Sequence, residues 1–125
     1  MVRRVTFLLD THVLLWWLGD SPKLSSVHRE AILGGDVVVS AVAVAELQIK
    51  ASMGKIDIPD DLNEVVAELG FGALAFDSRH AAALRDLPFH HKDPFDRMLI
   101  CQAHVDGLTF LTADDDCRKY DIATR

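Results

Sequence analysis

Short apolar runs alternate along the chain with longer, more amphipathic stretches. The runs have the length of buried strands and predict strands at residues 5–9, 37–39, 73–76 and 108–112, with a further short edge strand at 122–125. The longer stretches predict helices at residues 13–18, 25–33, 42–53, 61–69, 78–87 and 94–105. Strands and helices that alternate with short links predict an α/β fold. We expect a three-layer α/β/α sandwich with a mainly parallel central sheet of four to five strands.

Residues suited to capping mark the expected starts of several helices. Thr11 is expected to cap the first helix and Ser40 the helix at 42–53. The clearest start is Asp93-Pro94-Phe-Asp96, with Asp93 as the N-cap, Pro94 at the first helical position and Asp96 in the first turn.

Acidic residues stand near strand ends or helix starts at four places. Asp10 directly follows the first strand, and Asp114 follows the strand at 108–112. Glu46 lies a little over one turn into its helix, and Asp96 lies in a first turn. Because the carboxyl ends of parallel strands share one edge, where α/β proteins bind ligands, we expect these side chains to meet. Each alone also has an ordinary explanation as a cap, a turn residue or, for Glu46, an ion pair with Lys50.

Carboxylates that gather without matching cations repel one another, and a proton or a bound cation relieves the repulsion. An all-oxygen site suits Mg²⁺ or Mn²⁺. One or two such ions can activate a water and stabilise the leaving oxygen in phosphodiester cleavage. This chemistry would use Asp10, Asp96 and Asp114 as principal ligands, with Glu46 as a ligand or a water-orienting base.

Composition narrows the class of protein. The formal net charge of −6 is the wrong sign for binding nucleic acid through a basic face, but it does not exclude an enzyme whose acids are neutralised by cations. Two unpaired cysteines, Cys101 and Cys117, favour a reduced cytoplasmic protein. No run reaches the ~18 apolar residues of a membrane span, and the run after Arg3 and Arg4 is too short for a signal peptide. We expect one domain, residues 1–125.

Four blocks of the sequence resemble the PIN-domain ribonucleases, and within them the VapC-type toxins of type II toxin–antitoxin systems. The blocks are LLDTHVLLW at 8–16, SAVAVAE at 40–46, HKDPFDRMLICQA at 91–103 and LTAD at 111–114. The resemblance implies a PIN-like fold and a Mg²⁺- or Mn²⁺-dependent endoribonuclease whose acidic site is Asp10, Glu46, Asp96 and Asp114. It also implies an RNA substrate such as tRNA or rRNA, a cognate antitoxin that inhibits the enzyme by binding it, and usually a homodimer.

Polar residues close to the acids have two interpretations each. Thr11 and Thr112 could orient a water or a phosphate, although capping fits equally well. His90 and His91 suggest zinc only weakly, because no further His or Cys set accompanies them.

Basic and aromatic residues near the blocks are similarly ambiguous. Lys50, Lys92 and Arg97 could contact RNA phosphates or could be solvated surface charges. Trp16 and Trp17 lie in a helix without a polar face, so we expect them in the core or at a contact with the antitoxin or a second copy.

Three other functions stay open. A haloacid-dehalogenase-type phosphatase has an Asp after its first strand, but it normally needs a second Asp where this chain has His12. A non-enzymatic, Mg²⁺-binding phospho-receiver domain could use Asp77 as its acceptor, although no acidic pair precedes it. A PIN-domain nuclease that acts in RNA processing without an antitoxin is the third.

Overall fold

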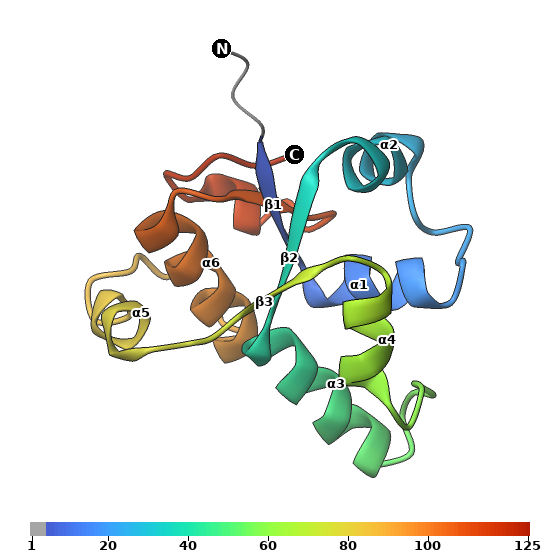
Figure 1. Cartoon of the computed structure of the whole chain (residues 1–125). Helices are drawn as coiled ribbons and strands as arrows, with labels where there is room; N and C mark the ends of the chain where they lie inside the picture. Colours follow the sequence, from blue (N-terminus) through green and yellow to red (C-terminus); the bar gives the residue numbers. More distant parts are fainter. Residues whose placement is uncertain (1–4) are drawn as a thin grey trace.

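A parallel sheet of four strands lies at the centre of the molecule (Figure 1). This computed structural model describes residues 5–125, so the first four residues of the expected domain, with Arg3 and Arg4, lie outside the described part. The strands are β1 (Thr6–Leu9), β2 (Asp36–Ser40), β3 (Gly72–Leu74) and β4 (Thr109–Leu111), in the order β3-β2-β1-β4. In place of the expected edge strand at 122–125, an isolated parallel bridge pairs Thr124 with Phe110 of β4.

Helices cover both faces of the sheet. One side carries α1 (Thr11–Leu18), α2 (Ser26–Gly34) and α4 (Leu62–Glu68), and the other carries α5 (Ser78–Ala83) and α6 (Pro94–Asp106). Alternate residues of β1 point to opposite faces: Phe7 and Leu9 join the core beside α1, and Leu8 joins the core beside α6. The expected three-layer α/β/α sandwich is therefore confirmed.

The carboxyl edge of the sheet is where the chain passes directly from strand to helix. Helix α3 (Ala41–Ser52) starts at once after β2 and contacts both α1 and α6. The Oγ of Ser40 accepts a hydrogen bond from Val42 N at 2.9 Å, which confirms Ser40 as the cap of α3. Asp93 caps α6 as predicted, because its Oδ1 accepts from Phe95 N at 2.8 Å and from Asp96 N at 3.1 Å.

Two predicted helix boundaries are wrong. Asp10, not Thr11, caps α1, since Asp10 Oδ1 accepts from His12 N at 2.9 Å. Helix α5 ends at Ala83 rather than at 87. After Ala83 the chain continues in tighter turns, in which Leu84 N donates to Ala81 O at 3.2 Å and Leu87 N donates to Leu84 O at 3.4 Å. Pro88 also disfavours a helical conformation at Leu87.

Smaller differences concern β3 and α4. Strand β3 ends at Leu74, because the next carbonyl, that of Ala75, accepts from Gln102 Nε2 at 3.2 Å. Asp61 occupies the N-cap position of α4 but makes no capping hydrogen bond with its side chain. Within residues 5–125, no helix combines the length and the apolarity needed to cross a membrane.

Candidate metal centre

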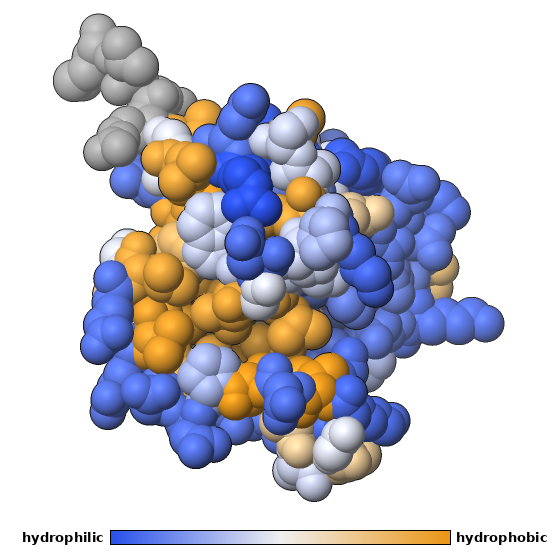
Figure 2. Space-filling view, turned by 90° about the vertical axis from the view of Figure 1, so that its right-hand side faces the viewer, coloured by the Kyte–Doolittle hydropathy of each residue, from blue (hydrophilic) through white to orange (hydrophobic). Residues whose placement is uncertain are grey.

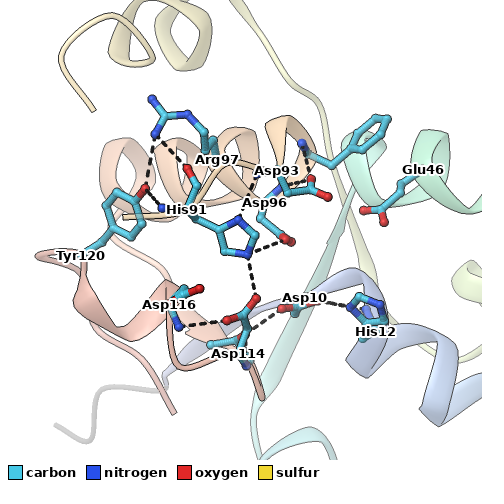
Figure 3. Close-up of polar contacts among 12 residues, drawn as sticks. Asp10, His12, Glu46, His91, Asp93, Asp96, Arg97, Asp114, Asp116 and Tyr120 are labelled. Carbon is cyan, nitrogen blue, oxygen red and sulfur yellow. Dashed lines mark hydrogen bonds and ion pairs between the residues drawn. The ribbon is translucent and has the colours of Figure 1, made fainter. Parts of the chain in front are cut away.

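The four predicted acids lie around one space at the carboxyl edge of the sheet (Figure 3). Asp10 ends β1, Asp114 follows β4, Glu46 comes from α3 and Asp96 comes from the first turn of α6. β1 and β4 are neighbours in the sheet, and α3 packs against α6, so four separate elements deliver their side chains to the same place. Three of the acids are buried, whereas the Asp114 side chain is 38% exposed.

Asp10 is a buried carboxylate with well-placed donors. The hydroxyl of Thr112 donates to its Oδ2 at 2.6 Å, and His12 N donates to its Oδ1 at 2.9 Å. Burial raises the pKa of Asp10, but the hydrogen bonds from His12 and Thr112 outweigh burial and hold this pKa below its ordinary value. The charged form of Asp10 is therefore favoured at the end of β1.

The pKa of Asp96 is shifted in the opposite direction to that of Asp10. Burial, followed by the negative charges of Asp10 and Asp93, raises the pKa of Asp96 to about 7. Its charged form is unfavourable unless a positive group approaches. A divalent cation is such a group, and oxygen ligands are those that Mg²⁺ and Mn²⁺ prefer.

Glu46 offers an oxygen that the described part of the protein leaves without a partner. Its Oε2 accepts from Lys50 Nζ at 2.6 Å, while its buried Oε1 accepts no hydrogen bond from any described residue. A buried carboxylate oxygen in this condition is costly, and coordination of a cation would satisfy it. Lys50, considered as a phosphate contact, is paired with Glu46 instead; this hydrogen bond raises the pKa of Lys50.

His91 joins the acids, a contact that sequence reasoning missed. Its Nε2 lies 2.7 Å from Asp114 Oδ2 and 3.2 Å from Asp96 Oδ2, and Figure 3 shows its ring between the two carboxylates. Burial lowers the pKa of His91, but the hydrogen bond to Asp114 and the charge of Asp96 outweigh burial and raise it. The available signal was its position two residues before the N-cap Asp93.

A thiol lies beside this histidine. Potential ligand atoms of His91, Asp96, Asp114 and Cys117 lie within 4.8 Å of one another, so these groups form a cluster that could hold a metal ion. Burial and the charge of Asp96 raise the pKa of Cys117 far above its ordinary value, so its neutral thiol is a poor ligand for a hard cation.

Both threonines considered in the sequence are buried. The hydroxyl of Thr112 donates a hydrogen bond to Asp10 Oδ2 and accepts one from Asp114 N at 3.0 Å. Thr112 therefore orients two of the four acids. The Oγ1 of Thr11 has no hydrogen-bond partner within the described part of the chain.

Two further candidates have structural roles. Arg97 is buried and donates to the carbonyls of Pro88, at 2.8 Å, and of Leu87, so its interpretation as a phosphate contact is wrong. Asp77 caps α5 and pairs with Arg79 at 3.0 Å, which removes the acceptor that a phospho-receiver would need.

A small open hollow adjoins the acids. It has a volume of about 240 Å³ and is lined by Asp10, His12, Trp16, Ala113 and Asp114. Trp16 therefore borders the space beside the acidic centre as well as packing on the core under α1.

A parallel α/β sheet with acids gathered at its carboxyl edge defines a class of domain with an acidic ligand site. The PIN-domain family model matches residues 7–123, and the chain belongs to this family. The family resemblance inferred from the four sequence blocks is thus confirmed.

Solved structures with the same fold come from several bacteria. A DNA-bound VapBC from Salmonella typhimurium is 18% identical, with a TM-score of 0.71 and coverage of 97% of each chain. VapBC2 from Rickettsia felis, bound to a promoter DNA fragment, is 12% identical, with a TM-score of 0.69 and coverage of 97% of this chain and 98% of that one. FitAcB from Neisseria gonorrhoeae is 22% identical, with a TM-score of 0.66 and coverage of 94% and 95%. No curated protein matches the chain in sequence.

Proposed function

We propose that the chain is a Mg²⁺- or Mn²⁺-dependent endoribonuclease, the toxin of a toxin–antitoxin pair, with Asp10, Glu46, Asp96 and Asp114 as its acidic site. The observation that carries this proposal is the convergence of these acids, three of them buried, in a PIN-family fold. Lys50, which pairs with Glu46, neutralises only part of the charge of the four acids.

The side chains fit a hard divalent cation. Asp10 stays charged because of its fixed donors, and Asp114 is oriented by the hydrogen bond from its own N–H to Thr112. The unpartnered Oε1 of Glu46 supplies a further oxygen, which can coordinate the cation or hold the proton of an attacking water. When bound, the cation supplies Lewis-acid chemistry: it lowers the pKa of water and stabilises charge on the phosphodiester.

An antitoxin partner is part of the proposal. The structures with the same fold include VapBC from Salmonella typhimurium, FitAcB from Neisseria gonorrhoeae and a toxin–antitoxin complex from Klebsiella pneumoniae. Figure 2 shows apolar side chains gathered on the face that carries α1 and α4, and this face includes partly buried Trp16, Trp17 and Phe71. We propose that the antitoxin covers this face beside the hollow, and that the toxin pairs with a second copy of itself.

Cleavage of a mixed pool of total RNA and tRNA tests the function. Purified, antitoxin-free protein should give discrete fragments with Mg²⁺ or Mn²⁺ and none with EDTA. Asp96→Asn, which preserves shape but removes a ligand charge, should lower the cleavage rate by roughly 100-fold or more. Added cognate antitoxin should suppress cleavage.

Asp115→Asn is the matched control, because Asp115 is 97% exposed and next to Asp114 in the chain. It should cleave at the wild-type rate. Full activity of Asp96→Asn would refute the site assignment, and cleavage that survives EDTA would refute the metal requirement.

A further inference from the structure

The imidazole of His91 occupies the space between two acids of the centre. Its Nε2 lies 2.7 Å from Asp114 Oδ2 and 3.2 Å from Asp96 Oδ2 (Figure 3). We propose that His91 competes with the divalent cation for these two carboxylates and thereby sets the affinity of the centre for metal. The inference rests on the proposed function, since it takes Asp96 and Asp114 as metal ligands.

The hydrogen bonds of the ring show which nitrogen carries a proton. His91 Nδ1 accepts from Asp93 N at 3.0 Å, so in the neutral ring the proton is on Nε2. A charged ring also carries a proton there. In both forms Nε2 is a donor to the carboxylates and has no lone pair for a metal, so His91 in this pose is a rival of the cation and not a ligand.

The segment that carries this ring is held in place on several sides. The backbone N–H of His91 donates to Tyr120 Oη at 3.0 Å, and its carbonyl accepts from Arg97 Nη1 at 3.4 Å. The side chain is only 16% exposed. His91 is therefore fixed in the centre from two sides, by Asp93 and Arg97 of the α6 region and by Tyr120.

A cation and this donor draw on the same two carboxylate oxygens. Mg²⁺ binds oxygen at about 2.0–2.1 Å and requires near-octahedral surroundings. Asp114 Oδ2 already accepts from Nε2 at 2.7 Å, and Asp96 Oδ2 lies 3.2 Å from the same nitrogen, so in our proposal the ring turns away when both oxygens coordinate an ion. Metal binding therefore includes the loss of a charge-assisted contact, which lowers the apparent affinity by about tenfold.

Mn²⁺ titration by calorimetry measures this competition. His91→Ala should bind Mn²⁺ about tenfold more tightly than the wild type, because the rival donor is gone. His91→Asn, whose shorter side chain withdraws the donor but stays polar, should shift the affinity in the same direction. Melting curves without metal verify that each variant is folded.

His90→Ala is the matched control. The His90 ring packs edge-on against Tyr120, with 4.9 Å between the ring centroids, and within residues 5–125 it forms no hydrogen bond or ion pair with the four acids. Its removal should leave Mn²⁺ affinity unchanged.

Mn²⁺ affinities of the His91 variants test the competition, whereas Mn²⁺ binding by Asp96→Asn tests the metal centre itself. Equal or weaker Mn²⁺ affinity in both His91 variants overturns the competition, while loss of Mn²⁺ binding in Asp96→Asn still upholds the centre. Undiminished Mn²⁺ binding by Asp96→Asn overturns the centre itself. A parallel Zn²⁺ titration distinguishes the other role: weaker Zn²⁺ binding by His91→Ala and by Cys117→Ser would identify both residues as ligands of a zinc site and overturn the competition.

Discussion

Asp10 at the end of β1 and Asp96 at the start of α6 are buried carboxylates of the same centre, but their pKa values are shifted in opposite directions. Asp10 receives a hydroxyl from Thr112 and a backbone N–H from His12. The backbone N–H of Asp96 donates to Oδ1 of the cap Asp93, and the side chain of Asp96 forms an ion pair with His91, with 3.2 Å between Oδ2 and Nε2. The pKa of Asp10 is accordingly lowered, whereas that of Asp96 is raised to about 7.

The comparison shows that fixed donors, and not burial alone, decide whether an acid in this protein is charged. Asp10 is 2% exposed and Asp96 is 7% exposed, so burial alone cannot separate them. The donors of Asp10 favour its charged form, whereas burial and the charges of Asp10 and Asp93 disfavour the charged form of Asp96 even with His91 at 3.2 Å. Three predictions test this difference.

Removing the two acids should change stability in opposite directions, the largest effect we expect. Asp10→Ala should lower the free energy of unfolding by about 2 kcal/mol, because α1 loses its cap and the Thr112 hydroxyl loses its acceptor. Asp96→Asn should raise it by about 2 kcal/mol at pH 8, because a charge that the fold disfavours is removed. Urea unfolding in EDTA measures both, and changes of the same sign would contradict the comparison.

The stability of the metal-free protein should fall as pH rises from 5 to 8. The pKa of Asp96 is about 7 in the fold, above its ordinary value of 3.8, so the unfolded chain releases this proton first. Stability is full below the unfolded pKa and is lost as pH rises through the folded one, at no more than about 1.4 kcal/mol per pH unit. The raised pKa of His91 acts in the same direction above its ordinary 6.5.

Melting temperatures in EDTA measure this slope, which should be several degrees across the range. Asp96→Asn should flatten it, and Mg²⁺ at pH 8 should restore the melting temperature. A melting temperature that rises with pH in the absence of metal would show that Asp96 is already charged in the fold.

The smallest change in unfolding free energy that we predict follows from removing the Thr112 hydroxyl, which donates to Asp10. Thr112→Val keeps the shape but removes the hydroxyl that donates to Asp10 and accepts from Asp114 N, so it should cost about 1–2 kcal/mol of unfolding free energy. NMR titration should also show a higher pKa for Asp10. Thr112→Ser retains the hydroxyl and should behave like the wild type; equal losses in both variants would place the cause in packing.

The parts of the fold that could be predicted from sequence depend on local rules or on topology. Asp93 and Pro94 start α6 through their own backbone preferences, and Ser40 caps α3 in the same way. The meeting of the four acids follows from a parallel sheet, which places every strand end on one edge. Their individual roles in catalysis stay predictions.

The parts that could not be predicted depend on distant contacts. Thr11 and Asp10 are adjacent and both suit a cap, so local preference alone does not decide between them. The Leu87 carbonyl, beyond the end of α5, accepts from Arg97 of α6, a contact that the local sequence around Leu87 does not indicate. His91 bridges Asp96 and Asp114 because of the path of the loop before α6, which no periodicity encodes.

The hydrogen bond between Thr112 and Asp10 joins residues 102 positions apart, and β1 pairs with both β2 and β4. The centre therefore cannot assemble until β4 has paired with β1 and brought Thr112 and Asp114 beside Asp10. Contacts so distant in sequence are costly in loop-closure entropy. A partly folded chain in which β4 is still unpaired therefore lacks the acidic centre, and β4 acts as the segment that completes it.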